Sequence, residues 1–326
     1  MKTRITEMLG IKYPLVCGGM MGLGRAELAA AVSNAGGLGT ISANIFSEQE
    51  ELTKEIEKVK QLTNRPFAMT ISMLPEMQSG EITKMYVRTA IEQKVPVVET
   101  SGASPEPFIG KLQENGIRVF HKVPAGKPAE RYALKAEKIG ADAVIIAGFE
   151  CGGHPGENQV SSLVFVPKVK KRVQIPVIAA GGFADASGFT AALALGADAV
   201  TMGTRFVFTE ECIAHPDTKQ RLIEASENDT VLVQKSIRNT TRVLANEAAE
   251  RALGIEARGG GLQDLMAVIN GKRGRAAWLE GKPDLGLLAC GTAVGLIDEV
   301  KPVQAVIEEI ISESQGVMAQ LKQIFG

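Results

Sequence analysis

The sequence predicts an α/β protein, a TIM (β/α)8 barrel with an inserted helical subdomain. Three observations indicate this fold. Eight short apolar runs, many rich in β-branched residues, lie between residues 13 and 206. Longer segments of helical periodicity separate these runs, as expected for parallel strands covered by helices. The count of eight units matches the barrel and disfavours the alternative, an open doubly wound sheet.

Each apolar run has the near-continuous hydrophobicity of a strand that is buried on both faces. A barrel places its strands in that environment, between a packed lumen and an outer ring of helices. The predicted strands are YPLVCGG (13–19), GLGTISAN (37–44), PFAMTISM (66–73), VPVVETS (95–101), IRVFHKV (117–123), DAVIIAG (142–148), IPVIAAGG (175–182) and DAVTMGTRF (198–206).

The segments between the strands have the features of covering helices. Residues 25–37 place Ala and Leu along one face and end on two glycines, which stop a helix. Residues 47–63 open on Ser47, and Glu50 follows at the spacing of a capping box. Similar helices, each ending in Gly-Ala before the next strand, are predicted over residues 127–141 and 185–197.

The regular alternation stops after the eighth strand. Residues 213–290 have a helical and loop-rich pattern that is too long for one covering helix. We therefore expect a barrel domain of residues 1–212 and 291–326, with residues 213–290 forming a helical lid or substrate subdomain over one mouth. The amphipathic segment from Asp298 to Phe325 is expected to complete the outer ring.

Composition limits the classes of partner and compartment. The chain has 326 residues and a formal net charge of -1, so nothing in the balance indicates nucleic acid. No targeting or transmembrane segment is recognised, because the N-terminal apolar stretches are short and interrupted by charges and glycines. Its cysteines are far apart and form no Cys-x-x-Cys pair, which predicts neither a disulfide framework nor a zinc site. We expect a cytoplasmic protein without membrane or nucleic-acid partners.

Glycines follow the seventh and eighth strands, where TIM barrels commonly hold a phosphate. Gly181 and Gly182 open one loop, and Asp185 is placed to cap the helix after it. Gly203 opens the other loop, and the hydroxyl of Thr204 could donate to a phosphate oxygen. Tight turns alone would explain any one of these glycines. Their occurrence at both positions favours a phosphate site built from backbone N–H groups and a helix N-terminus.

Lys122 lies near the carboxyl end of the fifth strand, where an ammonium could offset negative charge on a ring or a phosphate. The alternative is an ordinary lysine in water at the end of a strand. His121 points to the other side of the same strand and is expected to pack. His215, which precedes a predicted helix, is expected at the surface or as a cap.

The loop GFECGGHPGEN (148–158) contains His154 among glycines. Gly152, Gly153 and Gly156 would allow this loop to approach a flat ligand without side-chain collision. Histidine titrates near neutrality and can exchange a proton at working pH. His154 is therefore the candidate catalytic residue, with an exposed loop histidine as the alternative.

Metal ligation is not predicted in this loop. Glu150, His154 and Glu157 could lie near one another, but a single histidine without a partner at ligand spacing is poor evidence for a metal site. Cys151 has no base beside it in the sequence and is expected to be a buried structural cysteine.

Taken together, these segments resemble the nitronate monooxygenase family, formerly called 2-nitropropane dioxygenases. The resemblance covers nearly the whole chain, which makes it more specific than a single glycine motif. It implies a TIM barrel with a helical lid domain and non-covalently bound FMN. The segments that carry it are CGGMMGLGRAELAAAVSNAGGLGTIS, GFECGGHPGE, AAGGFADASGFTAALALGADAV, MGTRF, EARGG, NGKRGRAAW and DLGLLACGTAVGLID.

The resemblance also implies roles for individual residues. The catalytic histidine of the family matches His154. In the third strand, relatives commonly carry Gly-Val-Asn where this chain has Ala68-Met69-Thr70, and the hydroxyl of Thr70 can still hydrogen-bond to a flavin. The other implied FMN contacts are Gly19, Met20, Lys122, Gly152, Gly181, Gly182, Gly203 and Thr204.

The activity that the resemblance favours is oxidation of alkyl nitronates by O2 to a carbonyl compound and nitrite. One alternative is NAD(P)H:quinone reduction, because the histidine loop closely resembles that of a bacterial branch with this activity. A second alternative is FMN-dependent enoyl-acyl-carrier-protein reduction, for which Lys272, Arg273 and Arg275 could supply a basic docking face. A non-catalytic flavin-binding barrel is the remaining alternative. The expected partners are a nitronate or quinone, O2, NAD(P)H in the reductase alternatives, and a second copy in a homodimer through the helical subdomain.

Overall fold

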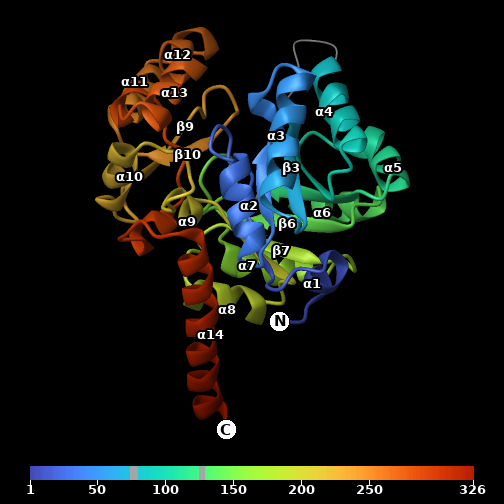
Figure 1. Ribbon diagram of the computed structural model, residues 1–326. Helices are drawn as coiled ribbons and strands as arrows, with labels where there is room; N and C mark the ends of the chain where they lie inside the picture. The colour runs from blue at the N-terminus through green and yellow to red at the C-terminus, as the bar shows by residue number, and fades with distance from the viewer. Residues whose placement is uncertain (74–79, 125–128) are drawn as a thin grey trace.

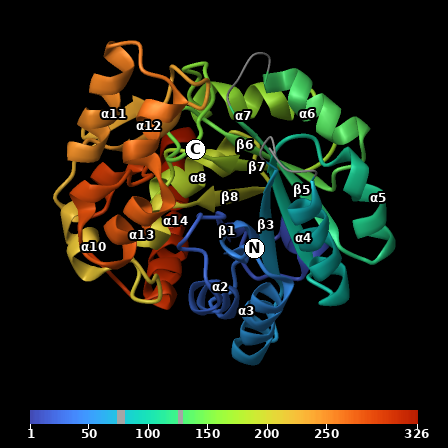
Figure 2. The ribbon, with the colours of Figure 1, turned by 90° about the horizontal axis from the view of Figure 1, so that it is seen from above.

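The computed structural model describes residues 1–73, 80–124 and 129–326 and contains one parallel barrel (Figures 1 and 2). Its order, β1-β8-β7-β6-β5-β4-β3-β2, leaves β1 and β2 as the ends of the sheet. A parallel bridge between Val16 and Leu38 joins these two strands and closes the barrel. The TIM barrel is therefore confirmed and the open sheet is wrong. The strands are β1 (Leu15–Cys17), β2 (Gly39–Ser42), β3 (Phe67–Met73), β4 (Val97–Gly102), β5 (Arg118–Pro124), β6 (Ala143–Ala147), β7 (Val177–Ala180) and β8 (Ala199–Met202).

A short helix that the sequence analysis did not predict, α1 (Arg4–Leu9), closes the amino-terminal end of the barrel. Ile5 is fully buried in a cluster with Val16 and Leu38 of the lumen. Arg4 Nε donates to Asp198 Oδ1 at 2.8 Å, which fixes the helix to the start of β8. The lower lumen is thus filled with apolar side chains, so any ligand site in the barrel lies at its other end.

Covering helices form the outer ring (Figure 2). The last of them, α14 (Val303–Phe325), packs against α8 and α2 over its first half and there closes the ring as expected, whereas residues 315–325 extend beyond the barrel (Figure 1), so that part of the prediction is wrong. Among the described residues, no helix combines the length and the apolar character that a membrane span needs. The other helices of the ring are α2 (Ala26–Asn34), α3 (Gln49–Leu62), α4 (Glu81–Glu92), α5 (Glu106–Glu114), α6 (Ala129–Lys138), α7 (Ser162–Lys170) and α8 (Ala186–Ala194).

The expected helix ends are confirmed in two places and wrong in one. Gly36 adopts φ +98° after α2, and Asp185 Oδ1 accepts from Gly188 N at 2.7 Å at the start of α8. The capping box of Ser47 and Glu50 does not form, because α3 begins later, at Gln49, with no side-chain cap. Glu50 instead pairs with Lys54 one turn further on, at 2.7 Å.

The segment after the barrel strands contains helices and a small hairpin. The hairpin, β9 (Thr230–Val233) with β10 (Thr241–Leu244), is antiparallel and was not predicted, because its strands are only four residues long inside a helix-rich stretch. Val233 and Val243 join α11 and α12 in a separate small core. The helices here are α9 (Thr204–Val207), α10 (Pro216–Ile223), α11 (Glu247–Ala257), α12 (Leu262–Ile269) and α13 (Gly271–Leu279), and the 3-10 turns of the chain are η1 (Ala43–Ile45), η2 (Pro283–Leu285) and η3 (Thr292–Leu296).

Close packing of α2 on β2 makes one stability prediction. A Cβ added at Gly39 would lie 1.8 Å from the carbonyl oxygen of Ala29, so Gly39→Ala must push the helix off the strand. We expect a loss of about 1 to 3 kcal/mol or more in the free energy of unfolding, measured by denaturant or thermal unfolding. Gly110→Ala is the matched control, because no atom lies within 4 Å of its added Cβ in the middle of α5. It should stabilise by about 0.5 to 1 kcal/mol, and equal effects at both sites would contradict the packing argument.

Candidate active site

Polar side chains form the upper layer of the barrel lumen. Each of them lies two residues after an apolar lumen residue on the same strand, so it points to the same interior. Thr40 and Thr201 are buried, and their hydroxyl oxygens have no hydrogen-bond partner among the residues described. Such unsatisfied groups in a lumen indicate room for a polar ligand above them. The complete layer is Thr40, Thr70, Glu99, Lys122 and Thr201.

A buried ion pair lies in this layer. Lys122 Nζ on β5 is 2.9 Å from Glu99 Oε1 on β4, and the Glu99 side chain is only 2 % exposed. Burial by itself lowers the pKa of Lys122, but the charge and hydrogen bond of Glu99 outweigh it, so the pKa is raised. Lys122 is therefore a fixed positive charge at the barrel mouth. Its ion pair with the buried Glu99 distinguishes it from an ordinary lysine in water.

The loop after β1 lies against β3 in the same layer. A Cβ at Gly19 would be 2.4 Å from Thr70 Cγ2, so only glycine allows this approach. The carbonyl oxygen of Met20 accepts from Ser42 Oγ at 2.9 Å and from Gly24 N at 2.8 Å, which holds the turn rigidly. The structure thus brings the predicted residues Gly19, Met20 and Thr70 together.

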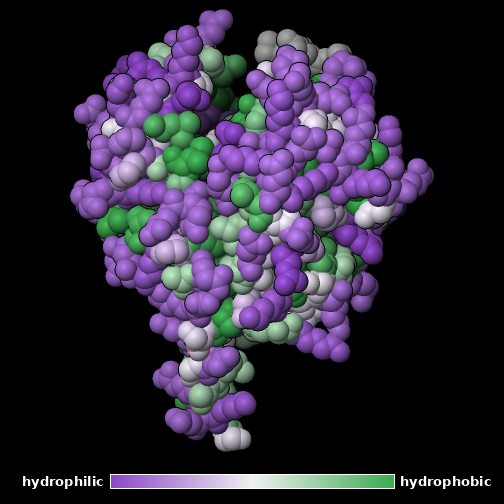
Figure 3. All heavy atoms as spheres, viewed as in Figure 1, coloured by the Kyte–Doolittle hydropathy of each residue, from purple (hydrophilic) through white to green (hydrophobic). Residues whose placement is uncertain are grey.

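The histidine loop is clamped from two sides by chain that follows β8. Gly153 and Arg242 exchange backbone hydrogen bonds of 2.7 and 3.1 Å, and Thr240 Oγ1 donates to Glu157 Oε1 at 2.7 Å. On the other side, a Cβ at Gly152 would lie 2.6 Å from the carbonyl carbon of Cys290. Gly152 is thus required for chain packing, in addition to any ligand contact. Figure 3 shows the surface hollowed between α11–α13 and α3, at the end of the barrel to which this loop belongs.

The environment of His154 favours the neutral imidazole. Its side chain is exposed, yet the surrounding protein desolvates the ring, and desolvation is the main cause that lowers its pKa. The positive charge of Lys122 lowers the pKa further, while a hydrogen bond with the Asn239 side chain opposes the shift. Since the pKa falls below its usual 6.5, His154 is available as a base or hydrogen-bond acceptor at neutral pH.

The pKa of each histidine can be measured, because the chain has only three. In NMR titrations of the ring signals, we expect His154 to titrate below pH 6.5 and His121 at about 4. Asn239→Ala should lower the His154 pKa further, because it removes the opposing hydrogen bond. Glu99→Gln/Lys122→Met should raise it, because the positive charge is lost without leaving a lone buried carboxylate. A His154 pKa above 6.5, or unmoved by both variants, would contradict this electrostatic picture.

A cradle of backbone N–H groups lies after β7 and β8. Gly181 and Gly182 adopt φ +95° and +82°, which other residues rarely do. The N–H groups of Gly182, Gly203 and Thr204 have no acceptor within the described part of the chain. A Cβ at Gly203 would meet no atom within 4 Å, so open space faces this loop. Thr204 Oγ1 accepts from Gly291 N at 3.0 Å, which leaves its own hydrogen free to donate to a ligand.

A cavity of about 330 Å³ lies behind this cradle, between α7, α8 and η3. Gly181 and Gly182 of the cradle line one side of it, and its polar lining includes the carboxylates of Glu150 and Glu227, which would repel a phosphate. Glu150 accepts from Ser162 N at 3.0 Å and so caps α7. The side of the cradle at Gly203 and Thr204, which does not line this cavity, therefore has the features of an anion site.

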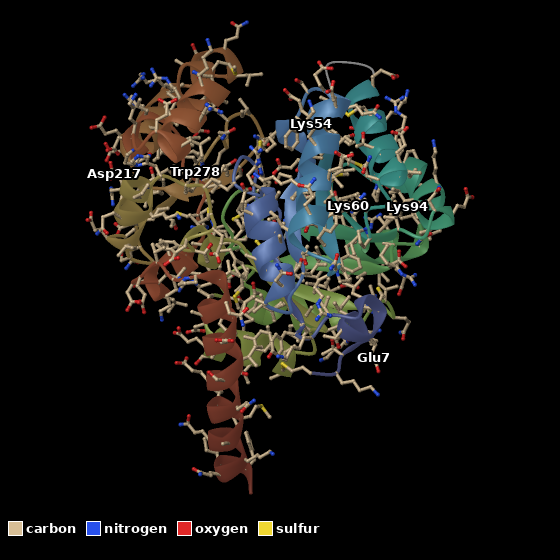
Figure 4. The ribbon with its side chains drawn as sticks, in the orientation of Figure 1. Glu7, Lys54, Lys60, Lys94, Asp217 and Trp278 are labelled. Carbon is tan, nitrogen blue, oxygen red and sulfur yellow. The ribbon has the colours of Figure 1, made fainter. Side chains whose placement is uncertain are left out.

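The other two histidines have the structural positions expected for them. His121 is 8 % exposed, and its Nδ1 lies 2.9 Å from Thr100 Oγ1. His215 Nδ1 accepts from Asp217 N at 3.2 Å and caps α10. Figure 4 shows Asp217 on the outer side of the molecule, away from the barrel mouth. Cys151 is half-buried rather than fully buried, and desolvation raises the pKa of its thiol to about 11, so the thiol is protonated at neutral pH.

Sequence reasoning missed three residues of the site. Glu99 had a usable signal, because a single carboxylate inside a buried strand needs a partner. Arg242 and Asn239 had no local signal, since they belong to a hairpin in a segment expected to be helical. Arg242 additionally donates to the carbonyl oxygen of Phe149 at 3.2 Å and to Thr230 Oγ1 at 2.9 Å, which ties the hairpin to the histidine loop.

A parallel eight-stranded barrel with glycine loops and titratable side chains gathered at the carboxyl ends of its strands defines a TIM-barrel enzyme. Within that class, the chain belongs to the nitronate monooxygenase family, whose model, described as "Nitronate monooxygenase", matches residues 2–313. This confirms the resemblance seen in the sequence.

Individual relatives extend over most of the chain. A (3aS,4S,5R,7aS)-5-hydroxy-7a-methyl-1-oxo-octahydro-1H-indene-4-carboxyl-CoA dehydrogenase of Mycobacterium tuberculosis is 32 % identical, with 96 % of each chain covered. A probable nitronate monooxygenase of Staphylococcus aureus is 34 % identical, covering 76 % of this chain and 80 % of its own. Among solved structures, FabK from Thermotoga maritima has a TM-score of 0.90 and 38 % identity, covering 99 % of both chains. The family, the dehydrogenase of Mycobacterium tuberculosis and the probable monooxygenase of Staphylococcus aureus are oxidoreductases, and so is this protein.

Proposed function

We propose that the protein is an FMN-dependent nitronate monooxygenase that oxidises alkyl nitronates with O2 to a carbonyl compound and nitrite. The observation that carries the proposal is His154, a base of lowered pKa on a clamped loop within electrostatic reach of Lys122. Membership of the nitronate monooxygenase family supports the same chemistry.

The residues at the mouth fit FMN. The N–H groups of Gly182, Gly203 and Thr204 would hold the phosphate, with Gly181 and the Thr204 hydroxyl completing the cradle. Lys122 would place its ammonium near the polar edge of the ring, where negative charge accumulates on reduction. When bound, FMN supplies electron acceptance from the substrate and the reaction with O2. The remaining predicted contacts, which would border the ring, are Gly19, Met20, Thr70 and Gly152.

His154 acts on the substrate in this proposal. Its neutral imidazole can remove the proton on the carbon beside a nitro group and so form the nitronate, or it can bind a nitro oxygen through the protonated ring nitrogen. Desolvation, together with the positive charge of Lys122, lowers the His154 pKa, which keeps the base unprotonated when the enzyme meets its substrate. The clamp of Arg242 on Gly153 keeps the loop in place, so less ordering is needed on binding.

A second candidate is oxidation or reduction of an acyl thioester. It is favoured by the Mycobacterium tuberculosis relative, a carboxyl-CoA dehydrogenase that matches 96 % of this chain, against 76 % for the Staphylococcus aureus monooxygenase. Lys272 and Arg275 on α13 are exposed, so they could meet the phosphates of a CoA or carrier group.

Anaerobic mixing of the yellow holoenzyme with single reductants separates these candidates. Bleaching of the FMN absorbance by an alkyl nitronate, and not by NADH or NADPH, is the expected result. Rapid bleaching by NADH or NADPH, followed by reoxidation with a quinone or an enoyl-CoA, would instead identify a quinone or thioester reductase. A colourless protein that cannot be reconstituted with FMN would overturn the flavin proposal itself.

A further inference from the structure

A strained turn joins the strands of the β9–β10 hairpin. Gln234 and Arg238 adopt φ +64° and +54°, a left-handed backbone that residues other than glycine rarely take. Gln234 is also only 7 % exposed, which is unusual for a glutamine. Such strain persists only where surrounding contacts hold it, and it gathers at functional sites. The contacts that hold Gln234 are therefore informative about the role of the turn.

These contacts set the direction of the Asn239 side-chain amide. Gln234 N donates to Glu256 Oε2 at 2.9 Å, which ties the start of the turn to α11. Asn239 N donates to the carbonyl oxygen of Gln234 at 3.1 Å, and Asn239 Nδ2 donates to Gln234 Oε1 at 3.0 Å. Because Gln234 Oε1 receives the NH2 group, the amide oxygen of Asn239 is left to accept elsewhere.

The hairpin carries this acceptor to the candidate catalytic residue. An antiparallel bridge between Gly153 and Arg242 fixes the hairpin on the histidine loop. In this register the Asn239 side chain is hydrogen-bonded to the His154 ring. An amide oxygen can only accept, so its partner is an N–H group of the imidazole. The bond also raises the pKa of His154, as an acceptor does when it favours the protonated ring.

We propose that Asn239, oriented by Gln234, fixes the tautomer of His154. The ring nitrogen that faces Asn239 keeps the proton of the neutral imidazole, and the other nitrogen keeps the lone pair. Under the proposed function, on which this step rests, the lone pair is offered to the substrate. His154 is then a base toward the carbon beside the nitro group, and not a donor to a nitro oxygen. Asn239 is a positioning residue, because it acts through His154.

The same contact assists the proton transfer. The free ring nitrogen of His154 forms a bond to the substrate proton, and the electron pair of the broken C–H bond stays on the substrate as the nitronate. The imidazole becomes a cation in this step. Asn239 then accepts from a charged donor, which makes a stronger hydrogen bond than a neutral one. Loss of Asn239 is therefore expected to slow proton removal more than it weakens binding.

Nitrogen-15 NMR of the holoenzyme reads the tautomer directly, because a ring nitrogen with a proton resonates far from one with a lone pair. At about pH 8 a histidine ring is mostly neutral. We expect His154 to favour one tautomer, and Asn239→Ala to change the ratio of tautomers by about 2- to 10-fold, as for the loss of one neutral hydrogen bond. His121 is the internal reference, because its ring lies against Thr100 and not against the hairpin.

Three further variants separate the direction of the amide from its presence. Gln234→Met removes the acceptor that orients Asn239, so the amide can turn and the tautomers of His154 should mix. Asn239→Asp keeps an oxygen toward the ring and should keep the native tautomer. Lys235→Gln, at an exposed position of the same turn, is the matched control and should leave the His154 signals unchanged.

Turnover at the same pH supplies the functional readout. With a neutral nitroalkane, Asn239→Ala should lower kcat by about 10-fold or more while KM changes little, because the bond to the charged ring is lost. Asn239→Asp should restore most of that loss. With the preformed nitronate, which has no proton to remove, the variants and the native protein should turn over at similar rates.

The NMR and kinetic measurements can fail separately. An equal mixture of His154 tautomers in the native protein, or a ratio unmoved by both Asn239→Ala and Gln234→Met, would overturn the proposal. A ratio that shifts as expected with no change in nitroalkane turnover would support the fixed tautomer and overturn the base role of His154, because the NMR measurement needs no substrate.

Discussion

Replacing His154 with Asn is expected to lower turnover by about 10²- to 10⁴-fold while the protein stays yellow. Asn keeps a polar side chain of similar reach on the clamped loop but cannot take a proton. The loop itself is held by backbone bonds between Gly153 and Arg242, which the substitution does not touch. FMN content is read from the visible spectrum, and kcat and KM from steady-state oxidation over a range of pH.

Two substrates distinguish the roles of His154. If the imidazole removes the proton, the loss is larger for a neutral nitroalkane than for the preformed nitronate. If it binds the nitro group, both substrates suffer equally. His215→Asn is the control, because His215 only caps α10 and Asn is also a good capping residue. Kinetics unchanged at every pH in the His154 variant would remove this residue from the mechanism.

Replacing Gly203 with Asp is expected to weaken FMN binding by about 100-fold or more, because a carboxylate beside a phosphate costs several kcal/mol. The substitution should spare the fold. Gly203 has φ -105°, its added Cβ meets no atom within 4 Å, and Asp is favoured at the N-cap position that it occupies on α9. Affinity is measured by fluorescence titration of the apoprotein.

Two controls isolate the phosphate in this experiment. Riboflavin, which has no phosphate, should bind the Asp variant and the native protein about equally. Gly203→Ser adds a small neutral side chain and should cost less affinity for FMN than Asp does. An Asp variant that binds FMN as tightly as the native protein would show that the phosphate lies elsewhere.

The candidate site was predictable where a residue's role depends on its own backbone. Gly181 and Gly182 adopt positive φ, and open space faces Gly203. The glycines themselves therefore indicate these features in the sequence. His154 was predictable for a different local reason, because a titratable side chain is unusual in a glycine-rich loop. Gly152 shows the limit of this reasoning, because its close neighbour is the main chain of Cys290, which is distant in the sequence.

The partners of these residues were not predictable. Glu99 meets Lys122 because the barrel sets β4 beside β5, and strand register then decides which side chains face each other. Arg242 meets Gly153 because a hairpin of the inserted segment docks on the histidine loop. One predicted helix end failed likewise: the capping box of Ser47 and Glu50 does not form, because α3 begins at Gln49 and Glu50 pairs with Lys54.

The barrel and its eight strands could be predicted from the sequence alone, and so could the candidate positions for a phosphate and for a proton donor or acceptor. Hydrophobic periodicity and glycine conformation are local properties, so they can be read along the chain. The charge of Lys122, the lowered pKa of His154 and the exposed apolar side chains at the end of α14 depend instead on the folded chain. Each of these depends on burial and on which residues, distant in the sequence, the closed barrel brings into contact.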